Sequence, residues 1–252
     1  MNKQLRIEDV SLTDTGLARS ENEDCHVSLP QQQVWLVADG MGGHDNGRFA
    51  SQAIVEAARA ASLPEGLEEA CYALGGAIHA ANDKIYATSR EAGKMMGSTV
   101  VALVVRNGEF AVMWAGDSRA YLYREDQLIQ LTKDHSQVQD LMDRGMLTPE
   151  EAADHPMRHV LARAVGVQPE LQIDAIRDQV TKGDLFLLCS DGLHGVVDEA
   201  DIAAILREHG SNGAQKLIEA SLDKGAPDNV TVVLVYASEP TMLVLAGQGS
   251  AG

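Results

Sequence analysis

The sequence predicts an α+β fold, a four-layer α-β-β-α sandwich in which two central antiparallel β-sheets are flanked by pairs of antiparallel helices. Short apolar segments alternate with tight turns up to about residue 237, and tight turns join antiparallel strands. Segments with apolar residues at helical spacing come in two pairs. Of the 252 residues, 45% are hydrophobic and 23% are charged, which is ordinary for a globular protein with a sizeable core. We expect a single domain over residues 1–237 and a flexible tail over 238–252.

The strands are predicted from apolar and β-branched runs that are bounded by turn residues. In chain order these runs are 34–38, 99–105, 110–114, 120–123, 128–131, 184–189 and 230–236. The first run stops at Asp39-Gly40. Asn107-Gly108, between the second and third runs, is the strongest hairpin signal because both residues tolerate a positive φ. Residues 125–126 form a second tight turn between two such runs.

The helices are predicted from apolar residues that recur at helical spacing. The four segments are 47–62, 66–92, 201–209 and 213–223, and the last two are separated at Gly210. Between the two pairs, Thr148-Pro149-Glu150-Glu151 combines a capping residue, a proline at the first helical position and a glutamate at the third. This pattern predicts a capping box that opens a short helix.

Composition excludes several classes of function. The chain carries 20 Lys and Arg against 37 Asp and Glu, a net charge of −17, which argues against binding nucleic acid through its phosphates. No apolar stretch approaches the roughly 18 residues of a membrane span, and residues 1–6 lack the apolar core of a signal peptide. Cys25, Cys71 and Cys189 have no metal-binding spacing, and we expect them to be small buried hydrophobic residues. These observations predict a cytoplasmic protein that binds neither membranes nor nucleic acid.

Four aspartates stand at the ends of the most apolar segments. Asp39, Asp117 and Asp191 each follow such a segment, and Asp228 directly precedes one. Each lies next to a glycine or within a turn, so an ordinary Asp turn explains any one of them. If the four ends converge, however, unpaired carboxylates would repel each other and raise each other's pKa. Divalent cations remove that repulsion, and oxygen ligands favour Mg²⁺ or Mn²⁺. The residues alone leave isolated turns and a metal cluster as alternatives.

The segment 15–24 places Arg19 four and five residues before Glu23 and Asp24. As a structural feature, this segment is a solvated turn held by pairing of arginine with carboxylate. As a functional feature, it sets an arginine beside a metal cluster, where the guanidinium holds two oxygens of a phosphoryl group. Composition does not choose between these interpretations.

Seven short motifs occur in a fixed order along the chain. They are Arg19-x-x-Asn22-Glu23-Asp24, Val37-Ala38-Asp39-Gly40-Met41-Gly42-Gly43-His44, Gly97-Ser98-Thr99, Ala115-Gly116-Asp117-Ser118-Arg119, Leu131-Thr132-x-Asp134-His135-Ser136, Ser190-Asp191-Gly192 and Asp228-Asn229-Val230-Thr231. In this order and spacing they resemble the metal-dependent Ser/Thr protein phosphatases of type 2C, in their compact bacterial form. The resemblance covers about residues 6–237 and implies a β-sandwich between two pairs of helices, with a two-metal site at one end.

The resemblance also implies which residues hold the metals, two Mn²⁺ or Mg²⁺ ions. Asp39 would bridge the two ions, with the Gly40 carbonyl on one of them, and Asp191 and Asp228 would hold the other. Asp117 matches the position that, together with Asp191, binds a third and weaker metal in bacterial members.

The remaining motif residues are implied to take part in catalysis. Arg19 matches the arginine that clamps the phosphate, Glu23 would act mainly through metal-bound water, and Asp24 would support it. In the mechanism that the resemblance implies, two cations would lower the pKa of a water molecule, the resulting hydroxide would attack phosphorus in line, and Arg19 and the metals would take up charge on the non-bridging oxygens. No nucleophilic side chain is needed, so no phosphoenzyme is expected.

One departure from the family pattern concerns the general acid. Eukaryotic members carry a histidine two residues after the bridging aspartate, proposed to protonate the leaving oxygen, and Met41 stands at that position here. His44, three residues further on, and a metal-bound water are the two candidates for this role. A histidine after Gly-Gly also serves as a turn or cap residue.

Residues 135–167 should form the mobile flap that bacterial members place beside the site. Residues 155–169 contain two arginines and no acid in a chain that is otherwise rich in acids. Arg158 or Arg163 would help to position a phosphoprotein substrate. The alternative is that these arginines form salt bridges with nearby acids such as Asp154.

The implied function is a hydrolase that removes phosphate from serine and threonine in proteins and opposes a bacterial Ser/Thr kinase in signal transduction. The implied partners are phosphorylated proteins, a cognate kinase and forkhead-associated-domain proteins, and we expect a monomer. Control of secretion-system assembly is one candidate setting. Two alternatives are a pseudophosphatase that binds phosphoproteins or a kinase without turnover, and a phosphatase that acts on a small phosphometabolite. The presence of Asp39, Asp191 and Asp228 disfavours the pseudophosphatase.

Overall fold

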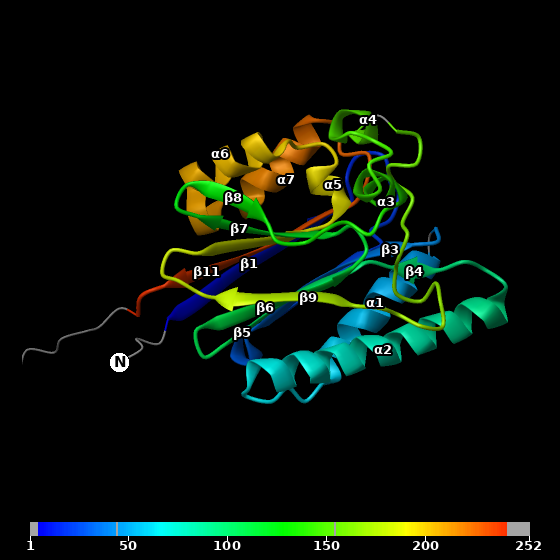
Figure 1. Cartoon of the computed structure of the whole chain (residues 1–252), viewed down its shortest axis with the longest axis horizontal. Coiled ribbons are helices and arrows are strands. Elements are labelled where there is room, and N and C mark those ends of the chain that lie inside the picture. The colour runs from blue at the N-terminus through cyan, green and yellow to red at the C-terminus, as the bar shows by residue number, and fades with distance from the viewer. Residues whose placement is uncertain (1–4, 44, 154, 241–252) are drawn as a thin grey trace, which may run out of the picture.

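The structure is a computed structural model that describes residues 5–43, 45–153 and 155–240. Two antiparallel sheets stack face to face, with helices outside each of them (Figure 1). The first sheet has the strand order β1 (Arg6–Asp14), β11 (Val230–Ser238), β10 (Leu185–Cys189), β7 (Arg119–Arg124) and β8 (Gln127–Gln130). The second has the order β2 (Asp24–Leu29), β3 (Val34–Met41), β5 (Val100–Arg106), β6 (Glu109–Ala115) and β9 (Asp174–Gln179), and β4 (Gly97–Ser98) pairs with β3.

Helices cover the outer face of each sheet (Figure 1). The second sheet is covered by α1 (Asp45–Ala60) and α2 (Leu67–Ala92), and the first by α5 (Asp191–His194), α6 (Glu199–His209) and α7 (Ala214–Asp223). Two shorter helices, α3 (Gln137–Asp143) and α4 (Pro149–Ala153), lie between β8 and β9 in the chain, and single 3-10 turns occur at Pro30–Gln32 and Gly210–Asn212. The predicted four-layer sandwich is confirmed.

The central strands are apolar along their whole length because both of their faces are covered. Successive side chains of a strand point to opposite faces. In β3, Trp35 and Val37 therefore join the core between the two sheets, whereas Leu36 and Ala38 pack under α1 and α2. The strands of the first sheet divide their side chains in the same way between the inner core and the layer under α6 and α7.

The local signals in the sequence form the expected structures, with one correction. Asn107 and Gly108 have φ values of 53° and 83° in the turn that joins β5 to β6. In the capping box, the Thr148 amide donates to Glu151 Oε2 at 2.9 Å, and the Glu151 amide donates to Thr148 Oγ1 at 3.3 Å. The prediction that the first strand stops at Asp39-Gly40 is wrong. The strand continues to Met41 because its last residues pair with β4.

The segment 135–167 contains α3 and α4 and is joined to the second sheet near its end. Val165 and Ser98 exchange backbone hydrogen bonds of 2.8 and 3.0 Å, and the Ala162 amide donates to the His135 carbonyl at 2.8 Å. The predicted C-terminal tail begins at Ser238, the last residue of β11, and its residues 241–252 lie outside the described residues.

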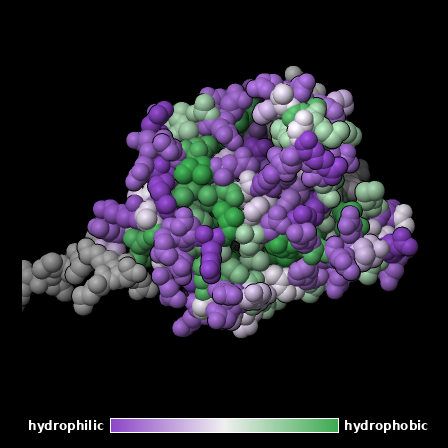
Figure 2. Space-filling view, in the orientation of Figure 1, coloured by the Kyte–Doolittle hydropathy of each residue, from purple (hydrophilic) through white to green (hydrophobic). Residues whose placement is uncertain are grey.

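The surface agrees with the acidic, polar composition. On the face in Figure 2, hydrophilic side chains cover most of the molecule, and hydrophobic ones gather between the two sheets, where the edge of the sandwich is open. Among the helices of the described residues, none combines the length and the apolar character that crossing a membrane requires.

Candidate metal centre and active site

Five carboxylates lie at one end of the sandwich. Asp24 of β2 is paired in register with Asp39 of β3. Asp117 lies in the turn between β6 and β7, Asp191 is the first residue of α5 directly after β10, and Asp228 stands two residues before β11. Because neighbouring strands are antiparallel, the end of one strand and the start of the next lie at the same edge. The topology thus brings the four aspartates singled out in the sequence into one region, with Asp24 beside them.

The loop that carries Arg19 and Glu23 is fastened to this end by a buried asparagine. Asn229 accepts from the Glu23 amide at 2.8 Å and donates to the carbonyls of Thr15 and Glu21 at 2.8 and 2.9 Å. Sequence reasoning assigned no role to Asn229. Its position directly after Asp228 is the signal that would have found it.

Asp24 is buried and held by two hydroxyl groups. Ser190 Oγ and Thr231 Oγ1 each donate to Asp24 Oδ2 at 2.7 Å, whereas Oδ1 is buried with no hydrogen-bond partner among the described residues. Burial raises the pKa of Asp24 to about 7, although the two hydroxyl groups act against this rise. No role was predicted for Ser190 or Thr231, although both lie in the seven motifs.

Burial and mutual repulsion disfavour the charged forms of these acids. Burial raises the pKa of Asp39 well above its usual value, and the charges of Asp24 and Asp191 add to the shift. The pKa of Asp191 is raised by burial and then by Asp228. The pKa of Asp117 rises to about 8, again through burial first and Asp191 second. Ionising all of these acids at neutral pH would therefore place more negative charge in the cluster than its surroundings compensate.

Two glycines allow the segments of the site to approach each other closely. A Cβ atom on Gly40 would lie 2.1 Å from the Gly47 carbonyl oxygen and 2.7 Å from that of Glu23. A Cβ atom on Gly192 would lie 1.9 Å from the carbonyl oxygen of Asn229. Glycine at these positions lets α1 and the Glu23 segment pack on β3, and lets Asp191 and Asp228 come together.

The residues of this cluster suit hard divalent cations. Carboxylate and carbonyl oxygens are the ligands that Mg²⁺ and Mn²⁺ prefer, and the buried Oδ1 atom of Asp24 and the raised pKa values show acceptors that lack positive partners. Within the part of the chain that the structure describes, no three His, Cys, Asp or Glu side chains are placed so that they could hold a metal ion as they stand. Asp228 Oδ2 accepts from Arg19 Nη2 at 2.5 Å, and Asp191 hydrogen-bonds to Asp39.

A cavity of about 360 Å³ opens beside the cluster. Asp117 and Asp191 line it on the sandwich side, and Arg158 and His159 line it from the segment 135–167. Arg158 is exposed and therefore lies where it can meet a ligand in this cavity.

Arg163 has a different position from Arg158. Its Nη1 donates to Asp174 Oδ1 at 2.7 Å and lies 3.1 Å from His135 Nε2. This arrangement is the salt bridge that the sequence analysis gave as the alternative, with Asp174 of β9 as the partner. Asp154, the acid suggested there, lies outside the described residues.

Met41 and His44 are the two positions that bear on the general acid. Met41 ends β3, paired with Gly97 of β4. His44 lies outside the described residues.

Comparison with known proteins identifies the family. The family model for protein phosphatase 2C matches residues 19–224, a range that contains six of the seven motifs and ends four residues before the last one, at 228–231. The chain belongs to the protein phosphatase 2C family. The resemblance inferred from the seven motifs is therefore confirmed.

Curated phosphatase 2C relatives match over most of this chain. It is 38% identical over 245 residues to the serine/threonine protein phosphatase PstP of Mycobacterium tuberculosis (strain H37Rv), covering 93% of this chain and 46% of that protein. The chain thus spans about half the length of this relative. It is 36% identical over 234 residues to the serine/threonine phosphatase stp of Listeria monocytogenes (strain EGD-e), covering 88% of this chain and 93% of that protein.

Solved phosphatase 2C structures share the fold. PppA, described as a key regulatory component of T6SS in Pseudomonas aeruginosa, superposes with a TM-score of 0.85 at 35% identity, covering 92% of this chain and 97% of that one. The catalytic domain of the serine threonine protein phosphatase PstP, in complex with 2 manganese ions, gives a TM-score of 0.82 at 34% identity, covering 93% and 100%.

Proposed function

We propose that this phosphatase 2C member is a metal-dependent protein phosphatase that hydrolyses phosphoserine and phosphothreonine in proteins. The observation that carries the proposal is the gathering of Asp39, Asp191 and Asp228 from distant segments, beside Arg19, in a chain of this family. The fold similarity to a phosphatase domain that binds two manganese ions supports it further.

Five residues are proposed to hold the divalent cations. Asp39, the Gly40 carbonyl, Asp191 and Asp228 would hold two Mn²⁺ or Mg²⁺ ions, and Asp117 would hold a weaker third ion together with Asp191. When bound, the cations neutralise the carboxylates and lower the pKa of water, which supplies a nucleophile for phosphorus at neutral pH. Such ions would also make the electrostatic potential at the site positive. The protein carries a net charge of −17 and would otherwise repel phosphate.

The other residues of the site are proposed to orient and bind. Arg19 has a half-exposed side chain whose guanidinium pairs with Asp228, and it would exchange this partner for two oxygens of a phosphoryl group. Asp24 is the first residue of β2 and Glu23 directly precedes it. Glu23 would contact metal-coordinated water and Asp24 would support it. Arg158 would contact the phosphoprotein in the cavity beside Asp117.

Three further roles stay proposals. Arg163, the second candidate for a substrate contact, is held by its salt bridge with Asp174 and is proposed to keep that structural role. His44 is retained as a candidate acid for the leaving oxygen. The expected partners are phosphoproteins, a cognate Ser/Thr kinase and forkhead-associated-domain proteins, in a cytoplasmic setting that the free thiols of Cys25, Cys71 and Cys189 suit. Similarity to PppA supports secretion-system control as one setting.

Hydrolysis assays test this proposal. We expect the full chain to hydrolyse para-nitrophenyl phosphate and phosphothreonine peptides with Mn²⁺, and EDTA to abolish both reactions. Binding of the phosphopeptide without turnover would indicate the pseudophosphatase, and turnover of small phosphate esters without turnover of phosphopeptides would indicate a metabolite phosphatase. Either result contradicts the proposal.

A further inference from the structure

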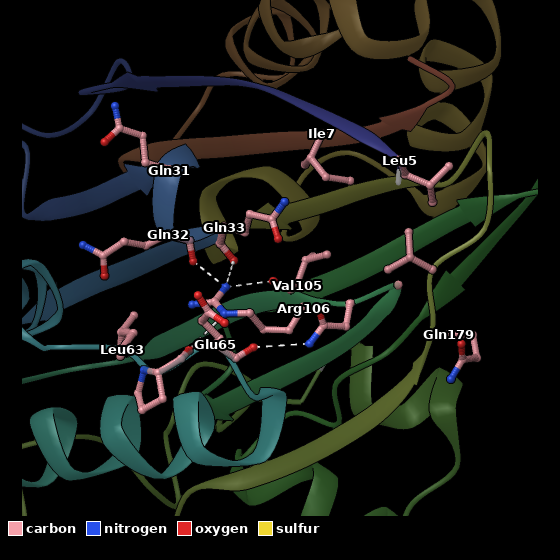
Figure 3. Close-up of a pocket in the computed structure, with 14 residues that line it drawn as sticks. Leu5, Ile7, Gln31, Gln32, Gln33, Leu63, Glu65, Val105, Arg106 and Gln179 are labelled. Carbon is pink, nitrogen blue, oxygen red and sulfur yellow. Dashed lines mark hydrogen bonds between the residues drawn. The ribbon is translucent and has the colours of Figure 1, made fainter. Parts of the chain in front are cut away.

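Figure 3 shows a second, larger cavity. It lies at the end of the sandwich opposite the carboxylates, as the path of β5 shows. It has a volume of about 870 Å³. Its lining includes the Asn107-Gly108 turn at the end of β5. The other end of β5 begins after Thr99, whose hydroxyl accepts from the Asp39 amide. Since a strand rises about 3.3 Å per residue, the seven residues of β5 separate the cavity from the metal centre by roughly 20 Å.

Arg106 lies in the middle of this cavity lining (Figure 3). The residue is 8% exposed. Its Nε donates to the Pro64 carbonyl at 3.2 Å, and its Nη1 donates to the carbonyls of Val105, at 2.8 Å, and of Gln32. The remaining nitrogen, Nη2, donates to no atom of the described residues.

No carboxylate of the described residues lies within ion-pair distance of Arg106. Glu109 is opposite Arg106 in the β5–β6 pairing, but its carboxylate accepts from Gln179 Nε2 at 3.1 Å. Glu65 lines the cavity and makes no salt bridge with Arg106. The acceptors around this guanidinium are therefore neutral backbone carbonyls.

A buried guanidinium with only neutral acceptors retains much of the cost of removing its charge from water. Burial lowers the pKa of Arg106, yet an arginine stays protonated at neutral pH. A purely structural role of Arg106 explains the hydrogen bonds of Nε and Nη1. They connect the 3-10 turn at Pro30–Gln32 to the loop after α1. That role does not account for Nη2, which has no acceptor among the described residues although Arg106 lines an 870 Å³ cavity.

The rest of the lining restricts the chemistry of a ligand. Leu5, Ile7, Val105 and Val180 form apolar walls, and most of the polar lining is uncharged amide side chains. Glu65 at the cavity and the net charge of −17 disfavour a ligand with two negative charges. The volume lies within the range of about 300–1,000 Å³ that is typical of small-molecule sites.

We propose that this cavity is a binding site for a small amphipathic carboxylate. The carboxylate would accept a hydrogen bond from Arg106 Nη2, and the apolar body would contact Leu5, Ile7, Val105 and Val180. This site is distinct from the phosphatase centre, and the proposal does not depend on the phosphatase function.

Binding of decanoate to the full chain, measured by titration calorimetry with decanol as a neutral probe of the same length, tests the site. We expect decanoate to bind more tightly than decanol, and Arg106→Gln to weaken decanoate binding by about tenfold or more while decanol binding stays unchanged. Arg207→Gln, at an exposed arginine of α6, is the charge-matched control and should leave both affinities unchanged.

A second pair of variants keeps the test decisive if Arg106→Gln fails to fold. Gln31 is exposed and lines the cavity, so Gln31→Lys and Gln31→Glu change the local charge without disturbing the core. Decanoate affinity should rise several-fold in the lysine variant and fall several-fold in the glutamate variant. Equal affinities for decanoate and decanol, no binding of decanoate at millimolar concentration, or decanoate binding that ignores both sets of variants would overturn the proposal.

Discussion

At the scale of a single residue, Asp39 has surroundings that suit metal binding but cost stability. The residue is paired in register with Asp24, and its carboxyl group is hydrogen-bonded to Asp191. The negative charges of Asp117 and Asp228 also raise its pKa. Without cations, such an arrangement costs stability, because burial and like charges both disfavour ionisation. The geometry that suits function is therefore expected to oppose stability at this position.

Replacing Asp39 with asparagine tests this opposition. In EDTA at pH 8, Asp39→Asn should raise the melting temperature, since each unit by which a pKa is raised corresponds to about 1.4 kcal/mol. In Mn²⁺ the variant should lose at least about a hundredfold in turnover, because even residues that only support metal ligands are worth 10- to 100-fold. Calorimetric melting and phosphopeptide assays measure both effects. A variant that melts lower than the wild type in EDTA contradicts the account.

Two arginines of the segment 135–167 are expected to differ. Arg158→Ala should raise the KM for phosphopeptides about three- to tenfold and leave the melting temperature unchanged, because this side chain lines the cavity at Asp117 and Asp191. Arg163→Ala should leave KM unchanged and cost about 1 kcal/mol or less of stability, because it removes a partly exposed ion pair with Asp174. Unchanged KM in both variants would remove Arg158 from the substrate site.

The sequence located the acids of the site but not the partners that position them. Asp39, Asp191 and Asp228 could be found because an acid at the end of an apolar run can be recognised from the sequence alone. The bonds from Asn229 to Thr15 and Glu21 join residues that lie more than 200 positions apart, and no local pattern reports such contacts. The partner of Arg163 was missed for a related reason, since Asp174 lies on an unpredicted strand.

At the scale of elements, two features made strands predictable: burial of both faces, and the tight turn at residues 125–126 that joins β7 to β8. The runs that became β3, β5, β6, β10 and β11 are continuously apolar because sheets or helices cover both sides. Sequence analysis did not predict β1, β2 and β9, which lie at the edges of their sheets and alternate with polar side chains. Their pairing depends on neighbours that are distant in the chain.

The junction of α5 with β11 gives a test at this scale. Gly192→Ala should lower stability by about 1–3 kcal/mol and reduce Mn²⁺-dependent turnover, because a Cβ atom there would overlap the Asn229 carbonyl. Gly76→Ala is the matched control in an exposed position of α2, where a Cβ atom meets nothing within 4 Å. It should raise stability by about 0.5–1 kcal/mol without changing turnover. Full activity of Gly192→Ala would show that this close packing does not position the acids.

At the scale of the whole molecule, the acid cluster couples stability to pH and to metal. Asp24 and Asp117 have pKa values raised to about 7 and about 8 from an unfolded value of 3.8. Between the unfolded and the folded pKa values, the folded state therefore binds more protons than the unfolded state. Stability therefore falls as pH rises through this range. Burial lowers the pKa of His135 and His194, which gives the opposite slope, but only below their unfolded value of 6.5.

The window from pH 7 to 9 isolates the carboxylates. In EDTA, the melting temperature should fall as pH rises from 7 towards 8 and beyond, and Mn²⁺ should restore it. Asp117→Asn should flatten the slope, whereas Asp83→Asn, at an exposed position of α2, should leave it unchanged. Thermal melts at fixed ionic strength measure these slopes. A melting temperature that is independent of pH in EDTA would show that the carboxylates do not repel each other as described.

The most direct test of the central claim is a crystal structure of the full chain grown with Mn²⁺, with the ions located by anomalous scattering. We expect two manganese ions at the end of the sandwich where β3, β10 and β11 meet, bound by oxygen atoms of Asp39, Gly40, Asp191 and Asp228. Carboxylates that point apart with no ion between them, in crystals saturated with manganese, would contradict the account.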